Sequence, residues 1–200
     1  MEELRPTPLF DPKGELPHGL VYRPEFISRA EEAVLLESIA PLPFREARFQ
    51  QYFARRRVVH FHPAGITTAY DSSADDSFSS GPLPPFLHAL AQKVGEALSV
   101  DPATFVHALV SEYRPGTPIG WHRDKPAYGI VIGLSLAGWG RMRFRPIASL
   151  PPHRDMFLLA LEPRSLYMMQ GPIRWQWQHS MLPTKSLRYS ITFRTRADAS

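Results

Sequence analysis

The stretch that decides the fold is GWHRDKPAYGIVIGLSL, residues 120–136. It begins with a histidine and an aspartate that one arginine separates, and it continues into an apolar run. On a strand, residues two positions apart point to the same face, so His122 and Asp124 can converge on one point. The apolar run predicts a buried strand directly behind this pair.

Short β-rich runs dominate the chain from about residue 104 onward. Turn residues separate FVHALVSEY, IVIGLSL, RMRFRP, MFLLALEP, SLYMMQG, WQWQHS and RYSITFRTR. Successive short strands without intervening helices favour an antiparallel sandwich or barrel. Taken alone, FVHALVSEY could also form a helix.

Two helices are expected upstream of these strands. SRAEEAVLLESIA begins at Ser28 and has Glu31 three residues later, which is the spacing of a capping box. PFLHALAQKVGEAL, from residue 85, is typical of a second amphipathic helix. The remaining N-terminal segments are an extended arm (1–24), an alternating strand (55–63) and an exposed polar loop (65–85). The fold class is therefore α+β and mainly β, with helices that support a β core.

Composition narrows the possible functions. The 200 residues fit one domain, and 44% of them are hydrophobic, as in globular proteins. The net charge of +4 and pI of about 9.6 favour an anionic partner such as nucleic acid, although an ordinary basic surface has the same signature. There is no cysteine, so any metal site must use histidine and carboxylate ligands.

The sequence gives no sign of membrane association. No apolar run approaches the roughly 20 residues of a membrane span, and the N-terminal segment lacks the apolar region of a signal peptide. We therefore expect a cytoplasmic protein that does not contact membranes. No obligate protein partner is indicated.

A pair H-x-D by itself is most often an ordinary surface pair, so a metal site needs a third ligand. His179 supplies a candidate at the end of WQWQHS. Two histidines and one carboxylate form the facial triad of non-haem Fe(II) enzymes, which leaves positions open for cosubstrate and oxygen. The other histidines (18, 60, 62, 88, 107 and 153) lack a comparable setting. Trp175 and Trp177, near His179, are expected to be core residues.

The run RYSITFRTR places four polar residues on one strand face, namely Arg188, Ser190, Thr192 and Arg194. Two guanidinium groups on a strand that looks buried are costly unless an anion meets them. A small dicarboxylate would satisfy both through bidentate hydrogen bonds. A solvated strand face with partnered arginines is the alternative.

In combination, these motifs resemble the AlkB-like 2-oxoglutarate- and Fe(II)-dependent dioxygenases. The match covers about residues 104–196, in the order Y-x-P-G, H-x-D, a distal histidine and R-x-x-x-x-x-R. The resemblance implies a double-stranded β-helix, or jelly roll, within a single domain over residues 1–200. About residues 104–196 would form the catalytic core, and about residues 1–103 the arm, lid and support helices. It also implies Fe(II), 2-oxoglutarate and O2 as cofactor and cosubstrates.

The resemblance assigns roles to individual residues. It makes His122, Asp124 and His179 the iron ligands. Tyr113 matches a tyrosine that helps bind 2-oxoglutarate, Arg188 the arginine that pairs with its distal carboxylate, and Arg194 the one near its iron-chelating end. Well-known repair members carry asparagine where this chain has Ser111 and Ser190. Serine is shorter, so contacts with the cosubstrate there would pass through water or be lost.

The N-terminal half resembles the family's nucleotide-recognition lid. ARRRVVHF matches an arginine and an aromatic residue of the lid at Arg56 and Phe61, and Tyr70 falls near a second aromatic. Arginines beside aromatics suit a surface for a flipped base, so these three residues are candidates for substrate binding. An ordinary amphipathic strand is the alternative.

Three functions are compatible with the sequence. The first is oxidative demethylation of alkylated bases in DNA or RNA. The second keeps the 2-oxoglutarate-dependent chemistry but acts on a protein or a small molecule. The third is a nucleic-acid-binding module without catalysis, whose triad is structural or empty; the complete triad and both arginines argue against it.

Overall fold

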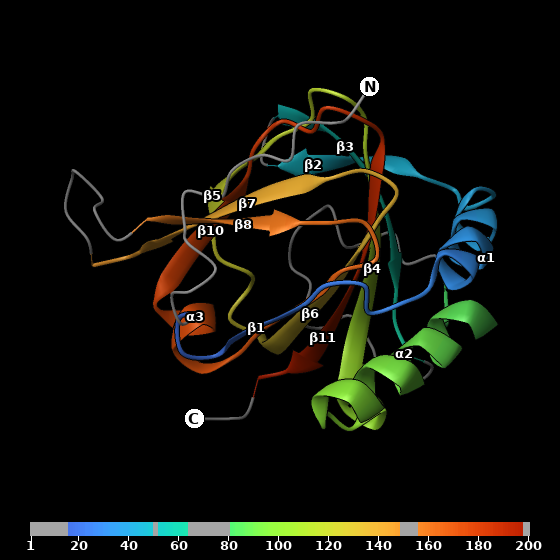
Figure 1. The fold of residues 1–200 in the computed structure, drawn as a ribbon, viewed down its shortest axis with the longest axis horizontal. Helices are drawn as coiled ribbons and strands as arrows, with labels where there is room; N and C mark the ends of the chain where they lie inside the picture. The colour runs from blue at the N-terminus through green and yellow to red at the C-terminus, as the bar shows by residue number, and fades with distance from the viewer. Residues whose placement is uncertain (1–15, 50–51, 64–80, 149–155, 198–200) are drawn as a thin grey trace.

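The computed structural model describes residues 16–49, 52–63, 81–148 and 156–197. Most of the predicted polar loop at 65–85 lies outside these residues. The described part is mainly β, with its strands paired in two antiparallel sheets (Figure 1). This arrangement confirms the predicted fold class.

The larger sheet has seven strands: β1 (Leu20–Arg23), β2 (Arg45–Phe49), β3 (Tyr52–Phe61), β4 (Phe105–Tyr113), β6 (Tyr128–Leu136), β9 (Leu166–Met169) and β11 (Arg188–Arg196). Their order is β1-β9-β6-β11-β4-β3-β2. The smaller sheet has four strands: β5 (Ile119–His122), β7 (Gly140–Pro146), β8 (Phe157–Leu161) and β10 (Trp177–Met181). Their order is β5-β10-β7-β8, so β5 lies at an edge.

The strand β4 lies in the interior of the larger sheet, between β3 and β11. Almost all of its residues are buried, because one face meets the helices and the other meets the space between the sheets. A strand covered on both faces reads as a continuous apolar run and not as an alternating one, which is why FVHALVSEY by itself also looked helical. In the structure, this segment forms the strand β4.

Both predicted helices are present and lie together beside the larger sheet (Figure 1). In α1 (Arg29–Ile39) the capping box forms: Ser28 Oγ accepts from the Glu31 amide at 3.2 Å, and the Ser28 amide donates to the Glu31 carboxylate at 2.8 Å. The second helix, α2 (Pro85–Leu98), has the predicted bounds. Two short helices were not predicted, the 3-10 turn at Pro102–Thr104 and α3 (Gly171–Trp175).

The N-terminal half does more than support the core, because it adds β1, β2 and β3 to the larger sheet. β1 forms within the segment expected to be an extended arm. One apolar cluster fills the space between the helices and the larger sheet, and a second packs around the smaller sheet. Among the described helices, none has the length and apolar character needed to span a bilayer.

Candidate active site

One pocket gathers most of the residues singled out in the sequence. It is lined, among others, by Arg56, Ser111, Tyr113, His122, Asp124, His179, Arg188, Ser190, Thr192 and Arg194. These side chains come from both sheets. The even spacing along RYSITFRTR places its four polar residues in the same pocket, as predicted.

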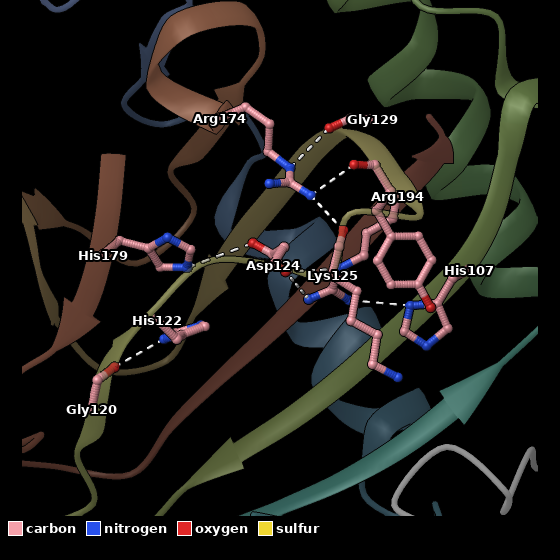
Figure 2. A network of polar contacts seen from close by, with 10 residues as sticks. His107, Gly120, His122, Asp124, Lys125, Gly129, Arg174, His179 and Arg194 are labelled. Atoms are coloured by element: carbon pink, nitrogen blue, oxygen red, sulfur yellow. Dashed lines mark hydrogen bonds and ion pairs between the residues drawn. The ribbon is translucent and has the colours of Figure 1, made fainter. Parts of the chain in front are cut away.

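The three candidate metal ligands converge in this pocket (Figure 2). His122 on β5 and His179 on β10 are direct partners in the antiparallel register, with ring centroids 4.3 Å apart. Asp124 follows β5, and its Oδ2 lies 3.6 Å from His179 Nε2. The alternation of β5 and its continuation therefore brings the H-x-D pair to one face, opposite the distal histidine.

The protonation states suit metal ligands. Burial lowers the pKa of His179 to about 3 and also lowers the pKa of His122, so both imidazoles are neutral at neutral pH. His122 Nδ1 donates to the Gly120 carbonyl at 2.9 Å, which leaves the lone pair on Nε2. Burial alone would raise the pKa of Asp124, but Arg194, with smaller contributions from His179, His122 and Arg174, outweighs burial, lowers this pKa and keeps the carboxylate ionised.

Arg194 lies directly against Asp124 (Figure 2). Its Nε and Nη2 donate to Asp124 Oδ1 at 3.0 and 2.8 Å, and its Nη1 is 3.1 Å from His107 Nδ1. His107 in turn is 3.0 Å from His60 Nδ1, so two histidines that had no assigned setting belong to the surroundings of the site. Among the described residues, no three His, Cys, Asp or Glu side chains are already arranged to hold a metal ion. Two neutral imidazoles and a carboxylate remain the right kinds of donor for Fe(II).

Arg188 is the largest fully buried side chain described, with 1% of its surface exposed. Its Nε donates to Ser135 Oγ at 3.1 Å, and its guanidinium carbon lies 4.8 Å from the centroid of the Tyr113 ring. Within the described residues, Arg188 Nη1 and Ser111 Oγ have no hydrogen-bond partner. Buried polar groups without partners are costly, so this end of the pocket is built to receive an acceptor, and a carboxylate fits it.

Burial would raise the pKa of Tyr113, but the guanidinium groups of Arg56 and Arg188 outweigh it and lower this pKa to about 8. Arg56, from β3, thus reaches the pocket. It lies beside Tyr113 and near the candidate ligands. The side chain of Ser190 also helps to lower the pKa of Tyr113, which places that serine in the same surroundings.

Two positioning residues were missed in the sequence. A Cβ atom added at Gly140 would lie 2.8 Å from Arg188 Nε, so only glycine leaves room for the arginine. Ser135 is aligned with Ser190 across the β6–β11 pair and accepts the hydrogen bond that orients Arg188. No local signal marks either residue, because both contacts join strands that are far apart in the chain.

Arg174 was also missed. It is 3% exposed, and it donates to the backbone carbonyls of Lys125, Tyr128 and Gly129 at 2.7, 2.7 and 3.1 Å (Figure 2). These bonds hold the loop that follows Asp124. The sequence around Arg174 does not indicate this contact, because the partners of Arg174 are backbone carbonyls.

The expectations for the lid are only partly met. Phe61 does not line the pocket but is buried in the core cluster that contains residues of α1 and α2, which corrects its assignment to base stacking. The reason is the period of a strand: Arg56 and Phe61 are an odd number of residues apart and therefore point to opposite faces of β3. Tyr70 lies outside the described residues. The expectation that Trp175 is a core residue is wrong, because it is 40% exposed, whereas Trp177 does pack against the core of the smaller sheet.

Known proteins resemble this chain in sequence and in fold. The model of the 2OG-Fe(II) oxygenase superfamily matches residues 19–194 of the chain. The solved structure of OsALKBH1 has the same fold, with a TM-score of 0.69 over 91% of this chain and 100% of that one, at 14% sequence identity.

Two curated proteins are similar over most of the chain. The mouse (Mus musculus) tRNA (carboxymethyluridine(34)-5-O)-methyltransferase ALKBH8 is 31% identical over 177 residues, which cover 85% of this chain and 25% of that protein. The probable RNA/DNA demethylase ALKBH6 of Danio rerio is 27% identical over 176 residues, which cover 84% and 70%. The chain thus spans about a quarter of the mouse protein's length.

Proposed function

The chain belongs to the 2OG-Fe(II) oxygenase superfamily, and on this premise we propose that it removes methyl groups oxidatively from alkylated bases of DNA or RNA. The observation that carries the proposal is the composition of the pocket. Two neutral histidines and a carboxylate meet there with a buried arginine whose Nη1 has no partner among the described residues.

The residues fit the cofactor and cosubstrate that the family implies. His122, His179 and Asp124 would hold Fe(II), and Arg188 would bind a carboxylate of 2-oxoglutarate. When bound, Fe(II) and 2-oxoglutarate supply the O2-dependent hydroxylation of an N-methyl group, which leaves as formaldehyde while 2-oxoglutarate becomes succinate and CO2. The chain's part is to bind and orient these groups.

The protein groups have distinct tasks. The backbone carbonyl of Gly120 fixes the tautomer of His122, so that Nε2 is the atom free to ligate. Arg194 holds Asp124 ionised and oriented through Oδ1. Arg174 fixes the loop that carries Asp124. Ser135 and Gly140 position Arg188 for its carboxylate.

A nucleic acid as substrate is supported by two further observations. The similar proteins are named for modification of tRNA and for RNA or DNA demethylation. The chain is basic, with a net charge of +4, and Arg56 brings a cation into the pocket next to Tyr113. A cation at this position suits a base or its phosphate. Arg56 is therefore the residue that we select as facing the substrate.

The test is a turnover assay with the full chain, Fe(II) and 2-oxoglutarate. Short DNA and RNA strands that carry single methylated bases are compared with the same strands without the methyl group, and both succinate and formaldehyde are measured. We expect formaldehyde from at least one methylated strand and its loss in His179→Ala. Glu37→Gln, an exposed substitution on α1, is the matched control.

The alternatives give different results. Iron-dependent succinate without formaldehyde from any strand would contradict a nucleic-acid substrate and favour a protein or a small molecule. Equal succinate from the wild type and His179→Ala would contradict the assignment of the ligands.

A further inference from the structure

The outer face of the smaller sheet carries a second set of arginines and aromatics, apart from the pocket. Along β5 and the two residues after it, His122 and Asp124 line the pocket, so the alternating residues Trp121 and Arg123 point away from it. On β7, Met142 and Phe144 are buried in the core, and the arginines between and beside them face outward. The motif that supplies metal ligands on one face thus supplies an indole and a guanidinium on the other.

The indole of Trp121 reaches across the sheet to β7. The guanidinium carbons of Arg143 and Arg145 lie 4.8 and 4.3 Å from the centroid of its rings. Such cation–π contacts hold both guanidiniums in place on the surface. Because β10 separates β5 from β7, the residues beneath the indole are those of β10.

The contacts of these arginines with β10 are with neutral groups. Arg143 Nε donates to Ser180 Oγ at 3.0 Å, and Arg145 donates from Nε and Nη2 to Gln178 Oε1 at 2.9 and 2.7 Å. Arg141, also on β7, donates from Nη2 to the Pro183 carbonyl at 3.5 Å. In the described ranges, neither Arg141 nor Arg143 forms an ion pair, and β5, β7, β8 and β10 contain no Asp or Glu. Among the described residues, the charges of Arg141 and Arg143 are therefore not neutralised by an ion pair.

A second aromatic borders this face. Trp175, at the end of α3, is 40% exposed, and its carbonyl accepts from Arg123 Nη1 at 3.3 Å. Its indole lies 4.4 Å from the guanidinium carbon of Arg174. An exposed indole beside ordered arginines is the combination on which unpaired bases stack while phosphates pair with guanidiniums.

We propose that this arginine–tryptophan strip, made of Trp121, Arg123, Arg141, Arg143, Arg145 and Trp175, binds the backbone and bases of a single nucleic-acid strand outside the catalytic pocket. A single strand fits better than a duplex, because stacking on Trp175 needs an unpaired base. The inference rests on the proposed function, since the strand bound here carries the base that enters the pocket. β5 joins the two sites, for it is an edge strand with Trp121 on its outer side and His122 on its inner side.

The test measures binding of an unmethylated single-stranded oligonucleotide to the full chain by fluorescence anisotropy at several salt concentrations. The double variant Arg141→Gln/Arg143→Gln removes two charges from half-buried positions on the outer face of β7. We expect its Kd at low salt to rise about tenfold and the slope of log Kd against log salt to fall by roughly 1 to 2. Trp175→Ala should weaken binding about tenfold without changing that slope.

The matched control is Arg23→Gln/Arg29→Gln, which removes two exposed arginines away from the smaller sheet. Its affinity and salt slope should equal those of the wild type. Circular dichroism verifies that every variant is folded. Equal losses of affinity in the control and the strip variant would overturn the proposal, because binding would then depend on net charge alone.

Two further outcomes separate this inference from the proposed function. Unchanged binding in the strip variants of a chain that demethylates oligonucleotides would overturn the strip and leave the function standing. Strip-dependent binding by a chain that demethylates no strand would support the strip and contradict the function. Vesicles of anionic lipid serve as a competitor: displacement of the oligonucleotide at equal charge concentration would overturn the choice of nucleic acid as the occupant.

Discussion

Arg194 and Asp124 form a bidentate pair in which Nε and Nη2 of the arginine share one carboxylate oxygen, Oδ1, at 3.0 and 2.8 Å. The other oxygen, Oδ2, faces His179 Nε2. Since the guanidinium already holds Oδ1, Oδ2 is the atom left for a metal ion. The pair therefore orients the carboxylate as well as keeping it charged, and it makes Asp124 important for the stability of the protein.

Replacing Asp124 by asparagine should have two effects. Turnover should be abolished, because the carboxylate ligand is lost. The metal-free protein should also lose about 3–5 kcal/mol of its free energy of unfolding, because the buried guanidinium of Arg194 would lose its countercharge. Denaturant unfolding without metal measures the second effect, with Glu37→Gln as an exposed control. An Asp124→Asn protein as stable as the wild type would show that the pair contributes nothing to folding.

Substitutions at Arg188 should weaken binding of 2-oxoglutarate. Arg188→Ala removes one member of a buried charge pair, at a cost of about 2 kcal/mol or more, so the apparent Michaelis constant should rise roughly 30-fold or more. Arg188→Lys should also raise it, because a point charge cannot replace a bidentate fork. Arg114→Lys, at an exposed arginine next to Tyr113, is the control. An unchanged constant in both Arg188 variants would rule out the assigned role.

Gly140→Ala should act through Arg188. The new methyl group would lie 2.8 Å from Arg188 Nε, so the guanidinium must shift away from Ser135. We expect a severalfold rise in the Michaelis constant for 2-oxoglutarate with little change in that for the nucleic acid. Gly120→Ala is the matched control, because no atom lies within 4 Å of the added Cβ. Equal effects at both glycines would mean that the Arg188 contact is not the cause.

Tyr113 should titrate at lower pH than an ordinary tyrosine. Its pKa of about 8 lies below the usual 10.0, so its tyrosinate absorbance should appear as pH rises through 8, and the folded state should gain stability between these two values. Bound 2-oxoglutarate should raise this pKa, because its negative charge offsets the guanidinium of Arg188. Ultraviolet absorbance titration measures both, and Tyr113→Phe should remove the early step. A wild type in which no tyrosine ionises before pH 10 would refute the electrostatic description.

The sequence by itself determined the parts of this protein that depend on local periodicity and spacing. A capping box and an amphipathic pattern placed both long helices, since each helix is stabilised by contacts a few residues apart. The period of two placed His122 with Asp124, and Arg188 with Arg194, on common faces. The same period of two also predicts the position of Phe61, because its odd spacing from Arg56 puts it on the opposite face of the strand.

The tertiary structure alone decided which residues hold those groups in place. Ser135, Gly140 and Arg174 act on Arg188 and on the loop after Asp124 through contacts that span 45 to 53 positions of the chain, for which no local pattern exists. The pairing of Arg194 with Asp124, and the exposure of Trp175, likewise follow from how strands and α3 pack. Periodicity fixes the face to which a side chain points, but only the assembled sheets fix what that face meets.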